Sequence, residues 1–297
     1  MIDVLKTVIV SFEGLFRCAM GEEKRCNVAG FPIKHSLTPY LFALVHEHLN
    51  LEWQMPGKIA TSSVDDIFKT SESTNVSKEF KEAVKKVTKE IIGEPFNFQN
   101  ISKIEVYQEK RNFDGFIHWG SITSPLKHQL GSTPANCYTF DKRGLRHSMT
   151  DGYAVVLVAE HFGLNFDSNP VLCLKGGGSA AIATAEAWFS MGGNIKAENG
   201  KRKLPEKLLR KCDSESDPDL YLDFDNSSNS DSLSLIPKYD SELQDSENRI
   251  DGRWMLVSQH LLAWAILFSP ENAERLPSLD LLFKRLISLE SMNIHIP

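Results

Sequence analysis

The chain contains 297 residues, of which 41% are hydrophobic and 24% are charged. This composition is typical of a globular protein and argues against wholesale disorder, and the length is sufficient for two domains of ordinary size. The formal net charge of −6 argues against nucleic acid as the main partner. No apolar run approaches the roughly 20 residues that a membrane-spanning helix needs, so we expect no membrane partner.

The N-terminal segment, residues 1–13, is apolar but carries Asp3 early and has no basic leader. It does not favour a secretory signal, and we expect a first strand or helix there. The five cysteines are scattered without a C-x-x-C pair, as in the reduced thiols of a cytoplasmic protein, which is the location we expect. The nine histidines show no H-E-x-x-H or similar spacing, so the sequence predicts no metal site.

A short strand is predicted over residues 26–33, followed by a helix over 40–49 whose apolar residues recur at helical spacing. Ser36 and Thr38 precede this helix, and Pro39 suits its first turn. Taken alone, the two hydroxyls favour helix capping. The alternative is that both hydroxyls bind a carboxylate at the start of the helix.

Residues 60–112 are polar, and they include a Lys/Glu-rich amphipathic stretch at 79–92 that predicts a solvated helix without chemistry. A strand is predicted over 113–119. It runs into a loop rich in Ser, Thr and Pro that ends at Lys127. On local grounds alone, Lys127 has the character of an ordinary surface lysine.

A β-hairpin is predicted from two strands, 137–140 and 145–149, which are joined by a turn at Gly144. A helix then begins at residues 150–153, with Thr150 or Asp151 at the capping position. Capping is the role that Asp151 has on local grounds alone.

The most informative stretch is residues 171–181, which combine an apolar strand, three glycines and the start of a helix over 180–189. Gly176, Gly178 and Ala181 form a G-x-G-x-x-A pattern, as in the opening half of a dinucleotide-binding βαβ unit. Glycine permits the tight turn and lets a pyrophosphate approach the backbone. The free N–H groups of the helix N-terminus would then bind the phosphates.

The next predicted strand, 194–197, is followed by Asn199 and then by the basic segment 201–203. This is about the spacing at which such folds contact the adenosine ribose. A basic cluster here, in place of a lone acid, suits a 2′-phosphate. We therefore predict NADP as the cofactor.

The helix predicted over 255–268 is strongly apolar, and Gln259 is its one uncharged amide. A buried amide must find partners or face a cavity. The remaining predicted elements are a helix over 205–212, a strand over 220–224, a polar loop over 226–234 and a last amphipathic helix over 277–289.

Six segments, taken together and in this order, resemble the shikimate dehydrogenase family. They are GFPIKHSLTP at 30–39, SITSPLK at 121–127, MTDG at 149–152, GGGSAA at 176–181, NGKRK at 199–203 and GRWMLVSQ at 252–259. The whole set, in family order, is far more specific than any one of its members.

The resemblance implies an α/β protein of two domains with a cleft between them. Residues 1–149 would form a substrate-binding α/β domain with a mixed sheet, to which residues 254–297 return, and residues 150–253 would form a Rossmann-type NADP-binding domain. The implied activity is the reversible, NADPH-dependent reduction of 3-dehydroshikimate to shikimate, in aromatic amino-acid (chorismate) biosynthesis. The implied partner is a hydroxylated ring carboxylic acid, bound by a monomer or a homodimer.

The resemblance also implies roles for individual side chains. Lys127 and Asp151 would be the catalytic pair at the reacting oxygen, a role that fits their chemistry, because a lysine ammonium beside a carboxylate can protonate a developing alkoxide. Ser36 and Thr38 would bind the substrate carboxylate. The other implied substrate-binding residues are Thr123, Gln259, Ser121 and Tyr138, and the implied cofactor-binding residues are Gly176, Gly177, Gly178, Ser179, Ala180, Asn199, Lys201, Arg202, Gly252 and Met255.

The chain departs from the family's asparagines at three positions: Ser121 in the lysine loop, Tyr138 in the hairpin, and Met149 directly before the Thr-Asp-Gly segment. The first two family asparagines usually contact the ring hydroxyls. The substrate is therefore open, and quinate or another hydroxylated ring acid is one alternative. A catalytically weakened paralogue that only binds ligand is another, although the retained catalytic pair favours an enzyme.

Overall fold

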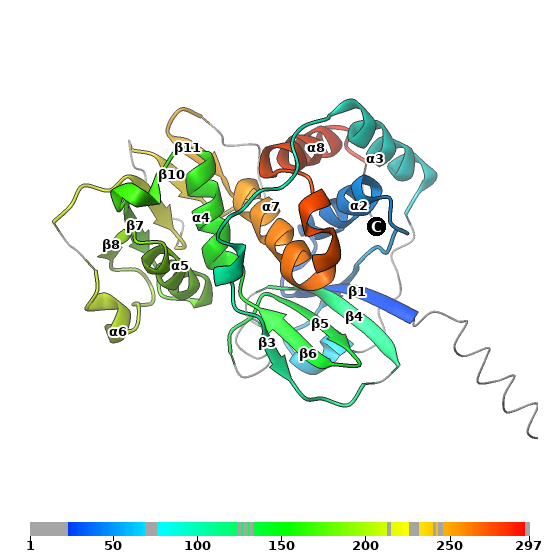
Figure 1. Ribbon diagram of the computed structural model, residues 1–297, viewed down its shortest axis with the longest axis horizontal. Coiled ribbons are helices and arrows are strands. Elements are labelled where there is room, and N and C mark those ends of the chain that lie inside the picture. Colours follow the sequence, from blue (N-terminus) through cyan, green and yellow to red (C-terminus); the bar gives the residue numbers. More distant parts are fainter. Residues whose placement is uncertain are drawn as a thin grey trace, which may run out of the picture.

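The computed structural model describes residues 23–68, 76–113, 115–123, 126, 130, 133–212, 215–225, 232–239, 242 and 246–294. Within these residues the chain forms a six-stranded and a five-stranded β-sheet, with helices packed around and between them (Figure 1). This is the two-domain α/β fold that the sequence predicts. The N-terminal strand or helix expected over residues 1–13 lies outside the described residues.

The first sheet consists of β1 (Glu23–Gly30), β2 (Gly57–Ala60), β3 (Tyr107–Glu109), β4 (Phe116–Ile122), β5 (Cys137–Asp141) and β6 (Gly144–Ser148). Their order is β2-β1-β4-β5-β6-β3. The sheet is mixed, as predicted, because β1 is parallel to β2 and β4 while the other pairs are antiparallel. The predicted hairpin is β5–β6, and Gly144 at its turn has a φ of +96°, which favours glycine.

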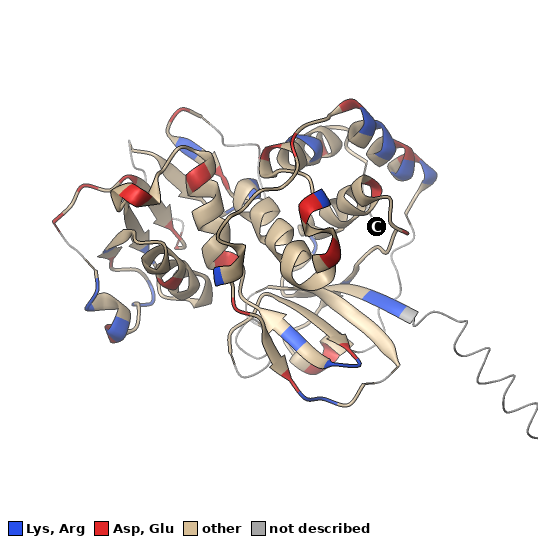
Figure 2. Ribbon diagram, in the orientation of Figure 1, with Lys and Arg blue, Asp and Glu red and all other residues tan. Residues whose placement is uncertain are grey.

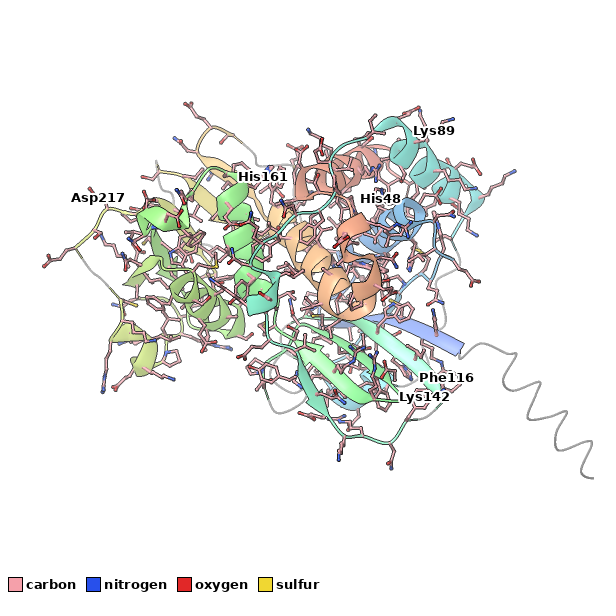
Figure 3. The ribbon with its side chains drawn as sticks, viewed as in Figure 1. His48, Lys89, Phe116, Lys142, His161 and Asp217 are labelled. Carbon is pink, nitrogen blue, oxygen red and sulfur yellow. The ribbon has the colours of Figure 1, made fainter. Side chains whose placement is uncertain are left out.

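Four helices lie together on one side of this sheet in Figure 1: α2 (Thr38–Leu49), α3 (Lys78–Glu90), α7 (Gly252–Ala263) and α8 (Leu279–Ser291). The C-terminal helices therefore pack back on the first domain, as predicted. His48 on α2, labelled in Figure 3, links the two ends of the chain. Its Nδ1 lies 3.0 Å from Nη1 of Arg285 on α8, and its Nε2 lies 2.9 Å from the carbonyl oxygen of Arg275.

The Lys/Glu-rich helix predicted to be solvated is α3, and one of its faces is buried. Ser77 caps it, since its Oγ accepts the N–H of Phe80 at 3.0 Å. At the other end, Arg285 donates to the carbonyl oxygens of Thr88 and Ile91 at 2.9 and 2.8 Å. These bonds satisfy carbonyl groups that have no partner within a helix end, so α3 holds α8 against the first domain.

The second sheet consists of β7 (Val171–Lys175), β8 (Asn194–Glu198), β9 (Leu220–Asp223), β10 (Ser234–Ile236) and β11 (Arg249–Asp251). The order is β11-β10-β9-β7-β8, and every pairing is parallel. With it go α4 (Asp151–His161), α5 (Ser179–Ser190) and α6 (Glu206–Leu209). After β8 the chain returns to the other side of β7, so the order of the strands reverses between β7 and β9. Ligands of open parallel sheets bind at the carboxyl ends of the strands at such a reversal.

Helix α7 contacts both domains. It packs on α2 and α8 of the first domain and on α4 of the second. His161, labelled on α4 in Figure 3, has its ring 4.7 Å from that of Trp254 on α7, and Trp254 stacks on Phe283 of α8 at 3.6 Å. At the other end of α4, Gly152 permits close contact with α5, because a Cβ there would lie 2.1 Å from the carbonyl oxygen of Ala183.

The predicted elements differ from the observed ones mainly at their bounds. β1 and β4 are each displaced by about three residues from the predicted strands, and α6 is shorter than the predicted helix over 205–212. The apolar helix predicted over 255–268 is α7 followed by a π-helical turn, η5 (Trp264–Phe268). Of the polar loop predicted over 226–234, residues 226–231 lie outside the described residues. The 3₁₀ turns are η1 (Val64–Phe68), η2 (Ile101–Lys103), η4 (Phe166–Ser168) and η6 (Pro270–Arg275).

Charged side chains lie mainly on the outer elements. Figure 2 shows lysine and arginine along α3 and around α6, while the central stretch of α7 carries little charge. Among the described residues, no helix has both the length and the apolar character needed to cross a membrane.

Two buried histidines flank Phe42 in the core of the first domain. His46 on α2 and His260 on α7 have their rings 5.9 and 5.8 Å from the ring of Phe42. Burial disfavours the charged imidazolium and lowers the pKa of His46 to about 4 and that of His260 to about 3, from 6.5. Both rings are therefore neutral in the folded protein at neutral pH.

We expect these two histidines to make the fold sensitive to acid. Below about pH 6.5 the two histidines bind protons in the unfolded chain but stay neutral in the folded protein. Their contribution to the free energy of unfolding is therefore fully present above that pH and declines as the pH falls toward 4 and 3. Urea unfolding at several pH values should show His46→Phe reducing the proton uptake near pH 5 by about one.

Val45→Ala is the matched control, because Val45 is buried beside His46 on α2. It should lower the free energy of unfolding at every pH without changing its pH dependence. An unchanged pH slope in His46→Phe would contradict a neutral, buried His46.

Candidate active site

A cavity of about 260 Å³ lies between the two sheets. The carboxyl ends of β1 and β4 border it from the first domain, through Val28, Ile122 and Thr123. From the second domain it is bordered by Phe224 and Pro237, which follow β9 and β10, and by Ala180 near the start of α5. α7 forms a third wall. The sequence-predicted site residues that line the cavity are Ser36, Thr38, Ser121, Thr123, Ala180, Gly252, Met255 and Gln259.

The two hydroxyls at the start of α2 form a buried hydrogen-bonded pair that faces this cavity. Ser36 Oγ donates to Thr38 Oγ1 at 3.1 Å, and Thr38 Oγ1 lies 3.0 Å from His260 Nε2. Neither is the N-cap residue of α2, which is Leu37. Ser36 Oγ does accept the N–H of Thr38 at 3.3 Å, so it satisfies one free N–H of the first turn. The two hydroxyls therefore line the cavity wall, in addition to the one bond that Ser36 makes to the first turn of α2.

Thr123 reaches the cavity from the end of β4 because the neighbouring strand carries a glycine. A Cβ on Gly30, which has a φ of +156°, would lie 1.7 Å from Thr123 Oγ1. The backbone N–H of Thr123 donates to the carbonyl oxygen of Ala29 at 2.9 Å. The end of β1 therefore fixes the Thr123 side chain toward the cavity, next to Ser121.

A cluster of amide and carboxylate groups forms the wall nearest α4. Asp151 is completely buried, and its Oδ1 accepts from Asn136 Nδ2 at 2.6 Å and from Gln259 Nε2 at 2.8 Å. The N-cap residue of α4 is Thr150, so Asp151 does not occupy the capping position expected on local grounds. Thr150 is itself held by Asn136, whose Oδ1 accepts the Thr150 N–H at 2.8 Å. The buried carboxylate lies directly behind two amides that line the cavity.

Tyr138 does not take the position expected of it. The side chain is completely buried in a second core cluster, with its ring 5.6 Å from that of Phe68, and burial raises its pKa well above the usual range. This corrects its assignment as a substrate contact, because no part of it borders the cavity. Asn136, two residues earlier, supplies an asparagine at the cavity. Met149 also lies elsewhere, at a separate depression beside Tyr153.

Lys127, the other member of the predicted catalytic pair, lies outside the described residues. Its role is therefore a proposal that rests on the sequence alone.

The glycine loop has the geometry that a dinucleotide pyrophosphate needs. Gly176 has a φ of +122°, and a Cβ on Gly177 would lie 2.2 Å from the carbonyl oxygen of Lys203. α5 begins directly after Gly178, which has no side chain to occupy the helix N-terminus, and Ser179 and Ala180 are its first residues. Backbone N–H groups are thus free of side-chain competition, as phosphate binding requires.

The predicted ribose-binding segment packs beside this loop. Asn199, Lys201 and Arg202 are exposed, and Arg202 Nη1 is 4.0 Å from the position that a Cβ on Gly178 would take. The Asp225 carboxylate, after β9, accepts the backbone N–H of Lys201 at 2.5 Å. This bond holds the basic segment against the glycine loop. The residues present therefore fit a phosphorylated dinucleotide.

Several cavity residues were not predicted. They include His35, Asn136, Phe224, Tyr239 and His260. The position of Asn136 could have indicated a place at the site, because it directly precedes a predicted strand and residues there lie at the edge of a sheet. His260 follows Gln259 in an apolar helix, and a second polar side chain there was an equally good indication of a cavity.

Solved structures with a similar fold include several shikimate dehydrogenases. One, a shikimate dehydrogenase in complex with NADP+, is 13% identical, with a TM-score of 0.59 over 92% of this chain and 96% of its own. Shikimate 5-dehydrogenase from Thermus thermophilus, in complex with NADP(H) and shikimate, is 17% identical, with a TM-score of 0.58 over 89% and 99%. Shikimate dehydrogenase from Aquifex aeolicus is 12% identical, with a TM-score of 0.53 over 90% and 98%.

Neither a scan of protein-family models nor a search of curated proteins gives a match to this chain. The likeness is therefore one of fold, extending over nearly the full length of each chain.

Proposed function

We propose that this chain, which has the fold of the shikimate dehydrogenases, is an NADP-dependent oxidoreductase that interconverts 3-dehydroshikimate and shikimate. The observation that carries the proposal is the convergence of two groups at one cavity: the Ser36–Thr38 hydroxyl pair and the amides bonded to Asp151. The same cavity reaches Ala180 at the start of α5, where the glycine loop ends. A ring acid and a nicotinamide can therefore share one cleft.

The substrate would lie with its carboxylate at Ser36 and Thr38, since hydroxyl donors suit an anionic oxygen. Its ring hydroxyls would face Ser121, Thr123 and Gln259, side chains that both donate and accept hydrogen bonds. Asn136 joins this set through its place in the cavity wall. Gly252 and Met255 would lie beside the nicotinamide.

The reduction transfers a hydride to the carbonyl carbon and a proton to the carbonyl oxygen, and NADPH supplies the hydride when bound. We assign Lys127 as the group that gives the proton to this oxygen, and Asp151 as its carboxylate partner. Two amide donors fix the Asp151 carboxylate in one orientation. A carboxylate fixed in this way would stabilise the ammonium form of Lys127, which is the form that gives the proton to the developing alkoxide.

An NADPH-oxidation assay with 3-dehydroshikimate, 3-dehydroquinate and no substrate tests the proposal. We expect oxidation that depends on 3-dehydroshikimate. Turnover of 3-dehydroquinate alone would instead identify the quinate-type alternative. Calorimetric binding of shikimate without turnover of either ketone would identify a ligand-binding protein, and the absence of both binding and turnover would refute the proposal.

We expect NADPH to bind at least about tenfold more tightly than NADH, roughly 1.4 kcal/mol. The guanidinium of Arg202 and the ammonium of Lys201 would pair with the 2′-phosphate that NADH lacks. Arg202→Gln should remove most of this preference by weakening NADPH and leaving NADH unchanged, as measured by calorimetry.

Arg210→Gln is the matched control, because Arg210 follows α6 and pairs with Glu206 at 3.2 Å. It removes the same charge without approaching the glycine loop, and both dissociation constants should stay at their parent values. Equal dissociation constants of NADPH and NADH for the parent protein would contradict the assignment of NADP as the cofactor.

A further inference from the structure

His260 is an ionisable side chain of the cavity that the proposed function leaves without a role. His260 follows Gln259 on α7, lines the cavity and is 4% exposed. Its Nε2 lies 3.0 Å from Thr38 Oγ1, which is 222 positions away in sequence. The second ring nitrogen, Nδ1, is buried and has no hydrogen-bond partner among the described residues.

The surroundings select one tautomer of this ring. Burial lowers the pKa of His260 to about 3, so the ring is neutral and carries a single N–H. If the proton were on Nδ1, a buried N–H would have no acceptor, which folded proteins rarely tolerate. With the proton on Nε2, the N–H donates to Thr38 Oγ1, and only a lone pair on Nδ1 remains without a partner. The tautomer with the proton on Nε2 therefore has the lower free energy.

The tautomer determines what the Thr38 hydroxyl presents to the cavity. Thr38 Oγ1 already accepts from Ser36 Oγ at 3.1 Å, and a second bond from His260 occupies its other lone pair. The hydroxyl proton of Thr38 then remains to be donated, and the cavity is where a ligand can accept it. A donor aimed at a ligand favours an anionic oxygen and disfavours a ligand group that can only donate, such as an ammonium.

We propose that His260 is a positioning residue that fixes the Thr38 hydroxyl as a hydrogen-bond donor toward the cavity and thereby selects ligands with a carboxylate at that end. The choice of a ring carboxylic acid rests on the proposed function. The arrangement Ser36–Thr38–His260 belongs to this chain's own geometry.

His260→Leu and His260→Gln separate the donor from the bulk of the side chain. We expect His260→Leu to raise the KM for 3-dehydroshikimate and the Kd of shikimate by about tenfold, with kcat and the Kd of NADPH within about twofold of the parent values. His260→Gln keeps an N–H donor and should recover most of the affinity. The Kd of shikimate methyl ester, which lacks the charge, should change little in either variant.

A long-range proton–nitrogen NMR spectrum of the imidazole rings gives a readout that needs no ligand. The signal lost in His260→Gln should belong to a neutral ring protonated on Nε2, and Thr38→Val should shift that same signal. A ring protonated on Nδ1, or unchanged shikimate affinity in a folded His260→Leu protein, would overturn the proposal. If the parent protein binds no ring acid at all, the proposed function fails, while the NMR spectrum still decides the tautomer.

Discussion

Asp151→Asn is expected to lower kcat for 3-dehydroshikimate reduction by about 10²–10⁴, the usual contribution of positioned acid–base groups. Asparagine has nearly the same shape, and its carbonyl oxygen can still accept from Asn136 and Gln259, which bond to Asp151 Oδ1 at 2.6 and 2.8 Å. The substitution therefore removes the charge while retaining the packing. The Kd of NADPH and the melting temperature should change little. Steady-state kinetics measures kcat, and calorimetry measures the Kd and the melting temperature.

Lys127→Ala should lower kcat to a similar degree, because the two side chains act as one unit in the proposed reaction. The double variant should then be little worse than either single variant. Asp167→Asn is the matched control for the carboxylate, since Asp167 is exposed in η4 of the same domain. Near-parent kcat in either Asp151→Asn or Lys127→Ala would show that the assigned mechanism is wrong.

The combined variant Ser36→Ala/Thr38→Val is expected to raise the KM for 3-dehydroshikimate by about a hundredfold or more. Each hydroxyl would lose a hydrogen bond to a charged oxygen, and such bonds contribute about 1.5–3 kcal/mol apiece. Cofactor affinity should not change, because neither side chain belongs to the glycine loop. The free energy of unfolding should fall by about 1–3 kcal/mol, since Thr38→Val leaves the buried His260 Nε2 without its partner.

Ser77→Ala distinguishes this result from a loss of helix capping. Ser77 is the cap of α3, where its Oγ accepts the Phe80 N–H at 3.0 Å, and its removal should cost about 0.5–2 kcal/mol of stability with no change in KM. If the Ser36/Thr38 variant behaved in the same way, losing stability while keeping its KM, the hydroxyls would be structural and the carboxylate site would lie elsewhere.

The sequence predicted those parts of the protein whose signal is local. The glycine loop is one case, because strand, turn and helix are contiguous from Val171 to Ser190. Gln259 is another: an amide in an apolar helix required a partner or a cavity, and the structure provides both, in Asp151 and the cleft.

The parts that sequence reasoning missed depend on strand direction or on distant contacts. β3, β10 and β11 have three residues each, too few for an alternating pattern to be recognised. Tyr138 was misassigned because it lies within β5, where its side chain packs in the core beside Phe68, whereas Asn136 lies just before the strand and reaches the cavity. The contact between Thr38 and His260 joins helices from opposite ends of the chain, which local sequence patterns do not reveal.

A crystal structure of the protein with NADP+ and shikimate tests the central claim most directly. We predict the ring acid in the cavity between the sheets, with its carboxylate within hydrogen-bond distance of the Ser36 and Thr38 hydroxyls. The ring hydroxyl to be oxidised should lie at the opposite end, toward Asp151 and the nicotinamide. Shikimate bound outside this cavity, or with its carboxylate turned toward Asp151, would contradict the assignment of the site.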